Sequence, residues 1–169
     1  MISELNTAIQ YMAKRRIGAL ISIEQGNSLE EFINTGIPIH SDISNQLITN
    51  IFIPNTPLHD GAVIIRDYKI AAAACYLPLS ENKMIPKELG TRHRAAIGLS
   101  EVSDAITIII SEETGKVSVA IREKLHRELS SSELVEVLSE QLVVEDQGDA
   151  EPTIVRWVRD FFKGGRSNG

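Results

Sequence analysis

Two short segments of this sequence carry residue types that could bind and activate a phosphate group. The first is Leu58-His59-Asp60-Gly61-Ala62, which places a carboxylate and an imidazole beside a glycine. Asp60 could hold a divalent cation or accept a proton from a hydroxyl group, and His59 could be a second metal ligand. Gly61 would let a ligand or another backbone approach closely. Because Asp-Gly is also a common tight turn, this segment alone leaves both interpretations open.

The second segment is Gly90-Thr91-Arg92-His93-Arg94. Thr91 is the expected N-cap of a helix that continues through Ala95 and Leu99. The free amide hydrogens of a helix start, together with two guanidinium groups, would form an anion site suited to bidentate phosphate contacts. A short basic run is by itself more often a solvated face, but its pairing with the acidic segment favours a phosphate site.

The two segments also resemble the motifs of a known enzyme family. Asp60-Gly61-Ala62 and Arg92-His93-Arg94 are similar to the DGA and RHR signatures of diadenylate cyclases, which make cyclic di-AMP. Residues 55–101 resemble the membrane-linked CdaA (DacA) branch of this DisA_N/DAC domain family, found in Gram-positive bacteria. The resemblance covers residues 5 to about 144, and neither motif departs from the family pattern.

The resemblance implies roles for the motif residues and for several residues outside the motifs. Asp60 would orient or deprotonate an attacking hydroxyl group, and His59 and Asp60 would hold a divalent metal ion, either Mn, Mg or Co. The residues implied to be catalytic are Asp60, Arg92, His93 and Arg94. The residues implied to contact the substrate are Gly61, Ala62, Tyr76, Leu77, Thr91, Ser111, Glu112 and Glu113.

Four of these substrate residues have an alternative structural role. Tyr76 and Leu77 follow an alanine-rich run, 71–74, and would either hold the adenine at a strand end or belong to the core. The small alanines would leave room for an adenine ring or for a closely packed helix. Glu112 and Glu113 would lie near the nucleotide or its metal, or they would form an acidic hairpin turn.

Composition limits the class of protein that could hold this site. The 169 residues fit one domain, and 43% apolar residues are enough for a core. A formal net charge of −6 argues against a general nucleic-acid binder, which needs a basic surface. Cys75 is the only cysteine, so the chain has no disulfide framework, and core packing is its expected role.

The sequence contains no apolar run near the roughly 20 residues of a membrane-spanning helix, and it begins without a signal-peptide pattern. The expected location is therefore the cytoplasm. The resemblance implies that the parent protein is anchored in the cell membrane by N-terminal transmembrane helices that are absent from this chain.

Periodicity and capping residues predict the elements that must position the two segments. Before the acidic segment we expect a helix over 3–15, a strand over 18–23, a short helix with a capping box of Ser28 and Glu31, and a helix capped by Ser41. A hairpin turning at 67–68 should join strands 63–66 and 69–77, followed by a surface loop over 80–89.

After the arginine segment, strands 105–110 and 116–121 should form a hairpin across residues 112–115. Ser130 and Glu133 have the spacing of a capping box for a helix that extends to residue 144. We expect an acidic linker over 145–151 and a last helix from Pro152, in which Trp157 is a packing anchor.

These elements predict a single α/β domain with a central mixed sheet flanked by helices. Residues 1–163 would form the diadenylate cyclase domain, and 164–169 a disordered tail. The expected function is the condensation of two ATP into cyclic di-AMP and two pyrophosphates by a homodimer of face-to-face subunits. A non-catalytic sensor of ATP or cyclic di-AMP is the alternative, and a metal-dependent phosphohydrolase is less favoured. The resemblance also implies a membrane regulator and a phosphoglucosamine mutase as partners, and no nucleic acid.

Overall fold

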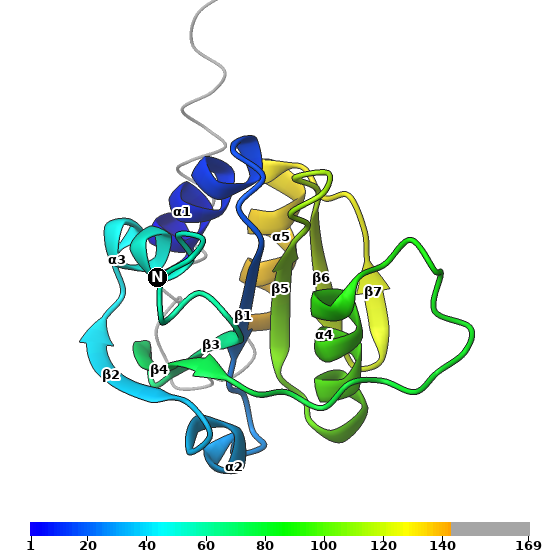
Figure 1. Ribbon diagram of the computed structural model, residues 1–169, viewed down its shortest axis with the longest axis horizontal. Helices are drawn as coiled ribbons and strands as arrows, with labels where there is room; N and C mark the ends of the chain where they lie inside the picture. The colour runs from blue at the N-terminus through cyan, green and yellow to red at the C-terminus, as the bar shows by residue number, and fades with distance from the viewer. Residues whose placement is uncertain (143–169) are drawn as a thin grey trace, which may run out of the picture.

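The computed structural model describes residues 1–142, which form one sheet with helices on both faces (Figure 1). The strands are β1 Ala19–Ile23, β2 Ile37–Asp42, β3 Ala62–Arg66, β4 Lys69–Cys75, β5 Ile106–Ile110, β6 Val117–Ile121 and β7 Lys124–His126. The helices are α1 Ile2–Lys14, α2 Glu30–Ile33, α3 Asn45–Ile51, α4 Thr91–Val102 and α5 Ser131–Leu142.

The sheet has seven strands in the order β2-β4-β3-β1-β5-β6-β7. The pair of β1 and β3 is parallel, whereas the other neighbouring pairs are antiparallel. This arrangement confirms the predicted α/β fold with a central mixed sheet. Every residue of β1 and β5 is buried, because helices cover both faces of the sheet at its centre.

Two apolar layers hold the helices on the sheet. On one face, α1, α3 and α5 pack on the strands through fully buried side chains such as Leu5 and Ile48. On the other face, α4 lies in front of the sheet, where Leu99 is fully buried (Figure 1). The three-and-four spacing of Leu5, Ala8, Ile9 and Met12 therefore predicted the buried face of α1 correctly.

The predicted hairpins are present, with small shifts at their ends. Asp67 and Tyr68 join β3 to β4 with positive φ angles of 49° and 59°, the backbone of a two-residue hairpin turn. The hairpin of β5 and β6 turns where it was expected. β4 ends at Cys75, before the predicted end at Leu77, and β7 is a short edge strand that the sequence patterns did not predict.

Three predicted helix starts were wrong. The proposed capping box of Ser28 and Glu31 does not form, because Leu29 rather than Ser28 is the N-cap of α2, and Ser28 Oγ accepts from the amide of Glu30 at 3.3 Å. Ser41 lies in edge strand β2, and Ser44 caps α3 instead, accepting from the amide of Leu47 at 3.2 Å.

The third wrong helix start is that of α4, for which Thr91 is the first helical residue and Gly90 the N-cap. At α5, in contrast, the predicted capping box is confirmed. The Ser130 amide donates to Glu133 at 2.8 Å, and the Glu133 amide donates to Ser130 Oγ at 3.3 Å. The predicted linker 145–151, the helix from Pro152 with Trp157, and the tail 164–169 lie outside the described residues.

Candidate active site

A cleft of about 560 Å³ lies at the end of the sheet where β1 and β3 begin and where β4 and β5 end. This volume is within the range of small-molecule sites. Both predicted segments reach it, one through the loop before β3 and the other through the first turn of α4. The residues that line it are Leu20, His59, Asp60, Gly61, Cys75, Tyr76, Leu77, Leu79, Thr91, Arg92, Ala95 and Glu112.

The acidic wall of the cleft is the loop that leads into β3. His59 Nδ1 lies 2.6 Å from the carbonyl oxygen of Thr56. A carbonyl only accepts hydrogen bonds, so Nδ1 carries the proton and the lone pair of Nε2 stays available. Histidines that bind metal are oriented in this way by the second ring nitrogen. Asp60 is the exposed neighbour of His59 at the mouth of the cleft.

His59 and Asp60 both line the cleft and are of the types that could serve as two ligands of a divalent cation. No group of three His, Cys, Asp or Glu residues within 1–142 could hold a metal ion. Two protein ligands suit an ion such as Mg²⁺, which usually keeps waters and completes its shell with substrate phosphates.

Gly61 is required by the backbone at this point. Its φ is +112°, and a Cβ atom would lie 2.8 Å from both the carbonyl carbon of Ala74 and the oxygen of Cys75. Ala74 itself has a φ of +53°, at an irregularity in the pairing of β3 with β4. The two strands thus meet in an uncommon conformation directly behind Asp60.

The basic wall is the start of α4. Arg92 is half-buried, and its Nη1 lies 3.0 Å from Glu112 Oε2, which follows β5. The guanidinium group crosses over Gly18, where a Cβ would lie 2.7 Å from Nη1 and 3.0 Å from the Cβ of Glu112. Arg92 is therefore held at the cleft by an acidic partner and by a glycine that leaves it space.

The segment after Tyr76 and Leu77 ties β4 to α4. A Cβ at Gly98 would collide with the backbone of Pro78, so the segment runs directly against the helix. Ser80 donates from its amide to the carbonyl of Arg94 at 3.0 Å and from Oγ to Glu101 at 2.5 Å. The segment after β4 is thereby joined to α4.

The family can be assigned once this geometry is compared with known proteins. The family described as DisA bacterial checkpoint controller nucleotide-binding, or DAC, matches residues 6–125. The chain belongs to the DAC family. This confirms the resemblance found in the sequence.

This DAC domain is similar to curated and solved relatives. It is 62% identical to the cyclic di-AMP synthase CdaA of Bacillus subtilis, over 81% of this chain and 50% of that protein. It resembles the crystal structure of a DacA double mutant from Staphylococcus aureus, with a TM-score of 0.82 and 56% identity, over 84% of this chain and 95% of that chain. The chain spans about half the length of the curated relatives it matches.

A second solved relative is described as a hypothetical membrane spanning protein from Bacillus cereus, with a TM-score of 0.73 and 45% identity, over 76% of this chain and 63% of that chain. In the DAC domain itself, no helix within residues 1–142 is both long and apolar enough to cross a bilayer.

Most of the predicted site residues gather at the cleft or beside it. His93, Ser111 and Glu113 line an adjoining hollow of about 80 Å³, which shares Thr91, Arg92 and Glu112 with the cleft. Two predicted site residues line neither the cleft nor the adjoining hollow. Ala62 is buried in β3, and Arg94 lies on α4 outside both. Their proposed roles stay predictions, as do those of the residues at the cleft.

The structure decides one alternative left open by the sequence and confirms a further prediction. Tyr76 is 74% exposed, so it is not a core residue, and it forms part of the cleft wall. Cys75 is buried in the core as predicted, and burial raises the pKa of its thiol to about 11. Gly18 and Leu79 at the cleft were not predicted from the sequence, since neither belongs to a motif that indicates chemistry.

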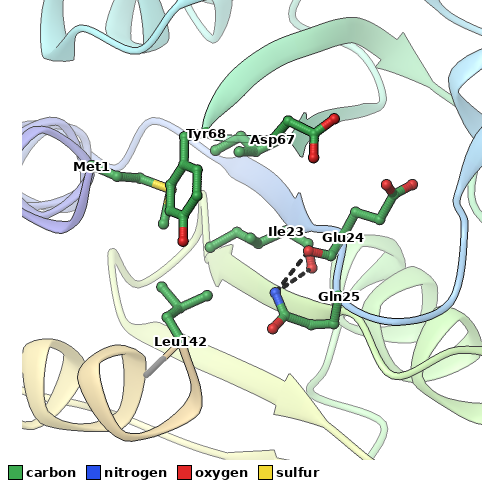
Figure 2. A pocket seen from close by; sticks show the side chains of 8 residues that line it. Met1, Ile23, Glu24, Gln25, Asp67, Tyr68 and Leu142 are labelled. Carbon is green, nitrogen blue, oxygen red and sulfur yellow. Dashed lines mark hydrogen bonds between the residues drawn. The ribbon is translucent and has the colours of Figure 1, made fainter. Parts of the chain in front are cut away.

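A second hollow, of about 100 Å³, lies at the opposite end of β1 (Figure 2). Met1 and Leu142 line it together with Tyr68 of the β3–β4 turn, and the Gln25 side chain donates to the carbonyl of Glu24 at 2.8 Å. At this volume the hollow is far below the usual size of a nucleotide site.

The buried imidazole of His93 should make the stability of this DAC domain depend on pH. Burial lowers the pKa of His93 below its usual 6.5, and the Arg127 guanidinium lowers it further. Below pH 6.5, His93 binds a proton in the unfolded chain but stays neutral in the folded chain until the pH falls further. The free energy of unfolding should therefore be unaffected above pH 6.5 and should fall on acidification, by at most about 1.4 kcal/mol per pH unit.

Urea unfolding at pH 7.5, 6.5 and 5.5 measures this dependence. His93→Gln cannot take up the proton. Its free energy of unfolding should therefore fall much less between pH 6.5 and 5.5 than that of the wild type. An equal dependence in wild type and variant would show that other groups cause it. His126→Gln, an exposed histidine on β7, is the matched control and should behave as wild type.

Proposed function

We propose that this DAC domain is the catalytic domain of a diadenylate cyclase, which condenses two ATP into cyclic di-AMP and two pyrophosphates. The observation that carries the proposal is that Asp60 and Arg92, from distant segments, line the same cleft of nucleotide size. The names of relatives at high identity, a cyclic di-AMP synthase among them, support the same activity. Residues 1–163 are proposed to form the catalytic unit.

Different walls of the cleft are proposed to bind different parts of the nucleotide. Arg92 and Thr91 at the start of α4 are proposed to bind the phosphates, because a guanidinium fork and helix amides both favour an anion there. Tyr76, Leu77 and Leu79 form the apolar wall, and the exposed ring of Tyr76 offers a surface on which adenine can stack. Ser111 and Glu113, in the adjoining hollow, are proposed to contact the phosphate end.

In the proposed reaction, the 3′-hydroxyl of each ATP attacks the α-phosphorus of the other. An O3′–phosphorus bond forms, the bond to the bridging oxygen of pyrophosphate breaks, and Asp60 orients the hydroxyl or takes its proton. Arg92 stabilises the negative charge that grows on the leaving pyrophosphate. His59 and Asp60 are proposed to hold the divalent ion, Mn, Mg or Co, which would neutralise phosphate charge when bound.

The proposal requires two copies of the domain. One cleft offers one set of phosphate and base contacts, whereas the product is a symmetric dinucleotide. Two subunits must therefore face each other across a two-fold axis, the commonest symmetry of protein dimers. We also propose that the parent protein is membrane-anchored, in keeping with the description of the Bacillus cereus relative as membrane spanning. A membrane regulator and a phosphoglucosamine mutase are proposed partners.

The proposal is tested by incubating the protein with ATP, separately with Mg²⁺, Mn²⁺ and Co²⁺, and separating the products by chromatography with mass detection. Cyclic di-AMP and pyrophosphate in a one-to-two ratio are the expected products. Binding of ATP without any turnover, also in a crosslinked dimer, would instead indicate a sensor. Linear products or free phosphate would indicate a phosphohydrolase and overturn the cyclase.

A further inference from the structure

The end of β4 is held by a hydroxyl group that lies outside the cleft. Tyr76, the first residue after β4, donates from its backbone amide to Thr35 Oγ1 at 2.8 Å. Thr35 Oγ1 donates in turn to the carbonyl of Phe32 in α2 at 2.6 Å. The Thr35 hydroxyl uses its single proton in the bond to Phe32, so it accepts the Tyr76 amide hydrogen through a lone pair. The two bonds connect α2 to the strand end that carries the apolar wall.

Close packing fixes the same strand end from both sides. A Cβ at Gly36 would collide with Cys75 Sγ and the carbonyl oxygen of Ala73, so the turn after α2 lies directly on β4. Gly61 presses against the same strand from the side of β3. Between these contacts, Ala74 keeps its left-handed φ of +53°. A non-glycine residue stays in this region only where its surroundings hold it there.

The turn that carries Thr35 is itself firmly attached to the body of the domain. Leu29 at the start of α2 is fully buried, and Phe32 packs against the same apolar cluster. Arg66 binds the carboxylates of Glu24, at 2.9 Å, and Glu30. The Thr35 hydroxyl is therefore a fixed point, and a strand end bonded to it is fixed as well.

We infer that Thr35 is a positioning residue for nucleotide binding, which sets the place of Tyr76 and Leu77 through the hydrogen bond to the Tyr76 amide. The inference rests on the proposed function and adds to it a residue that does not line the cleft. Its effect should be confined to the apolar wall of Tyr76 and Leu77, here called the base-binding wall. Pro78 and Ser80 are held on α4 by contacts of their own, so the phosphate-binding residues of α4 should keep their places. Thr35 should therefore influence binding of the base and leave binding of the phosphates unchanged.

The test compares Thr35→Val, which keeps the shape but removes the hydroxyl, with Thr35→Ser, which restores it. Binding of a non-hydrolysable ATP analogue and of inorganic tripolyphosphate is measured by calorimetry in the same buffer with Mg²⁺. Thr35→Val should weaken binding of the ATP analogue about fivefold, the effect of one lost hydrogen bond. Tripolyphosphate should bind as to wild type, and Thr35→Ser should recover the affinity for the analogue.

The control variant is Thr107→Val, which removes a buried hydrogen bond of 3.0 Å to Ser22 within the sheet. It should lower the melting temperature without changing the affinity for the ATP analogue. If Thr35→Val does not fold, Thr35→Ala makes the same test with the same expected loss.

Unchanged affinity for the analogue in Thr35→Val would overturn the inference about Thr35 and leave the proposed function standing. Equal weakening of the analogue and tripolyphosphate would also overturn it, since the effect would then not be confined to the base-binding wall. Failure of the wild-type protein to bind the analogue would overturn the proposed function and the inference with it.

Discussion

Asp60→Asn should abolish the formation of cyclic di-AMP while leaving the fold intact. Asparagine has the size of aspartate, but it cannot take a proton from the 3′-hydroxyl and is a much weaker ligand for a divalent cation. The loss of a general base alone costs about 100-fold to 10,000-fold in rate. The side chain of Asp60 is exposed and forms no ion pair or hydrogen bond with another residue of 1–142, so the variant should unfold at the wild-type temperature.

The measurement is the rate of pyrophosphate release together with the melting temperature. Asp67→Asn is the matched control, because it makes the same substitution at an exposed turn at the opposite end of β3 and should keep full activity. Asp60→Asn with wild-type activity would remove Asp60 from the chemistry. Equal inactivation of both variants would show that the assay responds to something other than the site.

Arg92→Ala should weaken the binding of ATP by about 2 kcal/mol, or about 30-fold, which is typical of a lost charged hydrogen bond. Arg92 Nη1 lies 3.0 Å from Glu112 Oε2, which leaves the other N–H donors of the guanidinium group for the phosphates. Arg92→Lys keeps the charge but loses the planar fork, and it should show an intermediate loss.

Calorimetry with a non-hydrolysable ATP analogue measures this affinity. Lys69→Ala, on the exposed start of β4, removes the same charge far from the cleft and should bind as wild type. Glu112→Gln removes the carboxylate partner of Arg92 and tests the predicted substrate contact of Glu112, since weaker binding would support that contact and unchanged or tighter binding would contradict it. Unchanged affinity in Arg92→Ala would contradict its assignment to the phosphates.

Local patterns in the sequence predicted most of the central fold. Five consecutive apolar or β-branched residues, as in Ile106–Ile110, favour a strand that is buried on both faces. The capping box of Ser130 and Glu133 joins residues three positions apart and depends on nothing distant. Where such local information decides the structure, prediction and structure agree.

The failures occurred where distant residues decide the local structure. Ser41 has the type of a helix cap, but its segment pairs with β4 and becomes an edge strand. Leu29 is the N-cap of α2 and its amide donates to the Glu24 carboxylate at 2.6 Å, so the helix begins one residue later than a capping box from Ser28 requires. The capping pattern at these two positions was present in the sequence, but a contact outside the helix decided where each helix begins.

The candidate site was predicted as two motifs, and the structure brings both to one cleft. It also separates residues that the motif grouped together. Arg92 and Arg94 are two positions apart on a helix, and such side chains point in different directions. Thr35 and Gly18 could not be predicted, because each matters through a contact with a residue far away in the sequence.

The position of the hollow lined by Met1 and Leu142 determines how the cleft would be oriented if the domain were attached to a surface. Both residues lie at the end of β1 that points away from the cleft. A tether joined at Met1 therefore leaves the cleft pointing outward from whatever surface holds it. Two copies fixed side by side would then have parallel clefts, and each would have to tilt before the clefts could face each other. The length and slack of the tether would set how often such pairs meet.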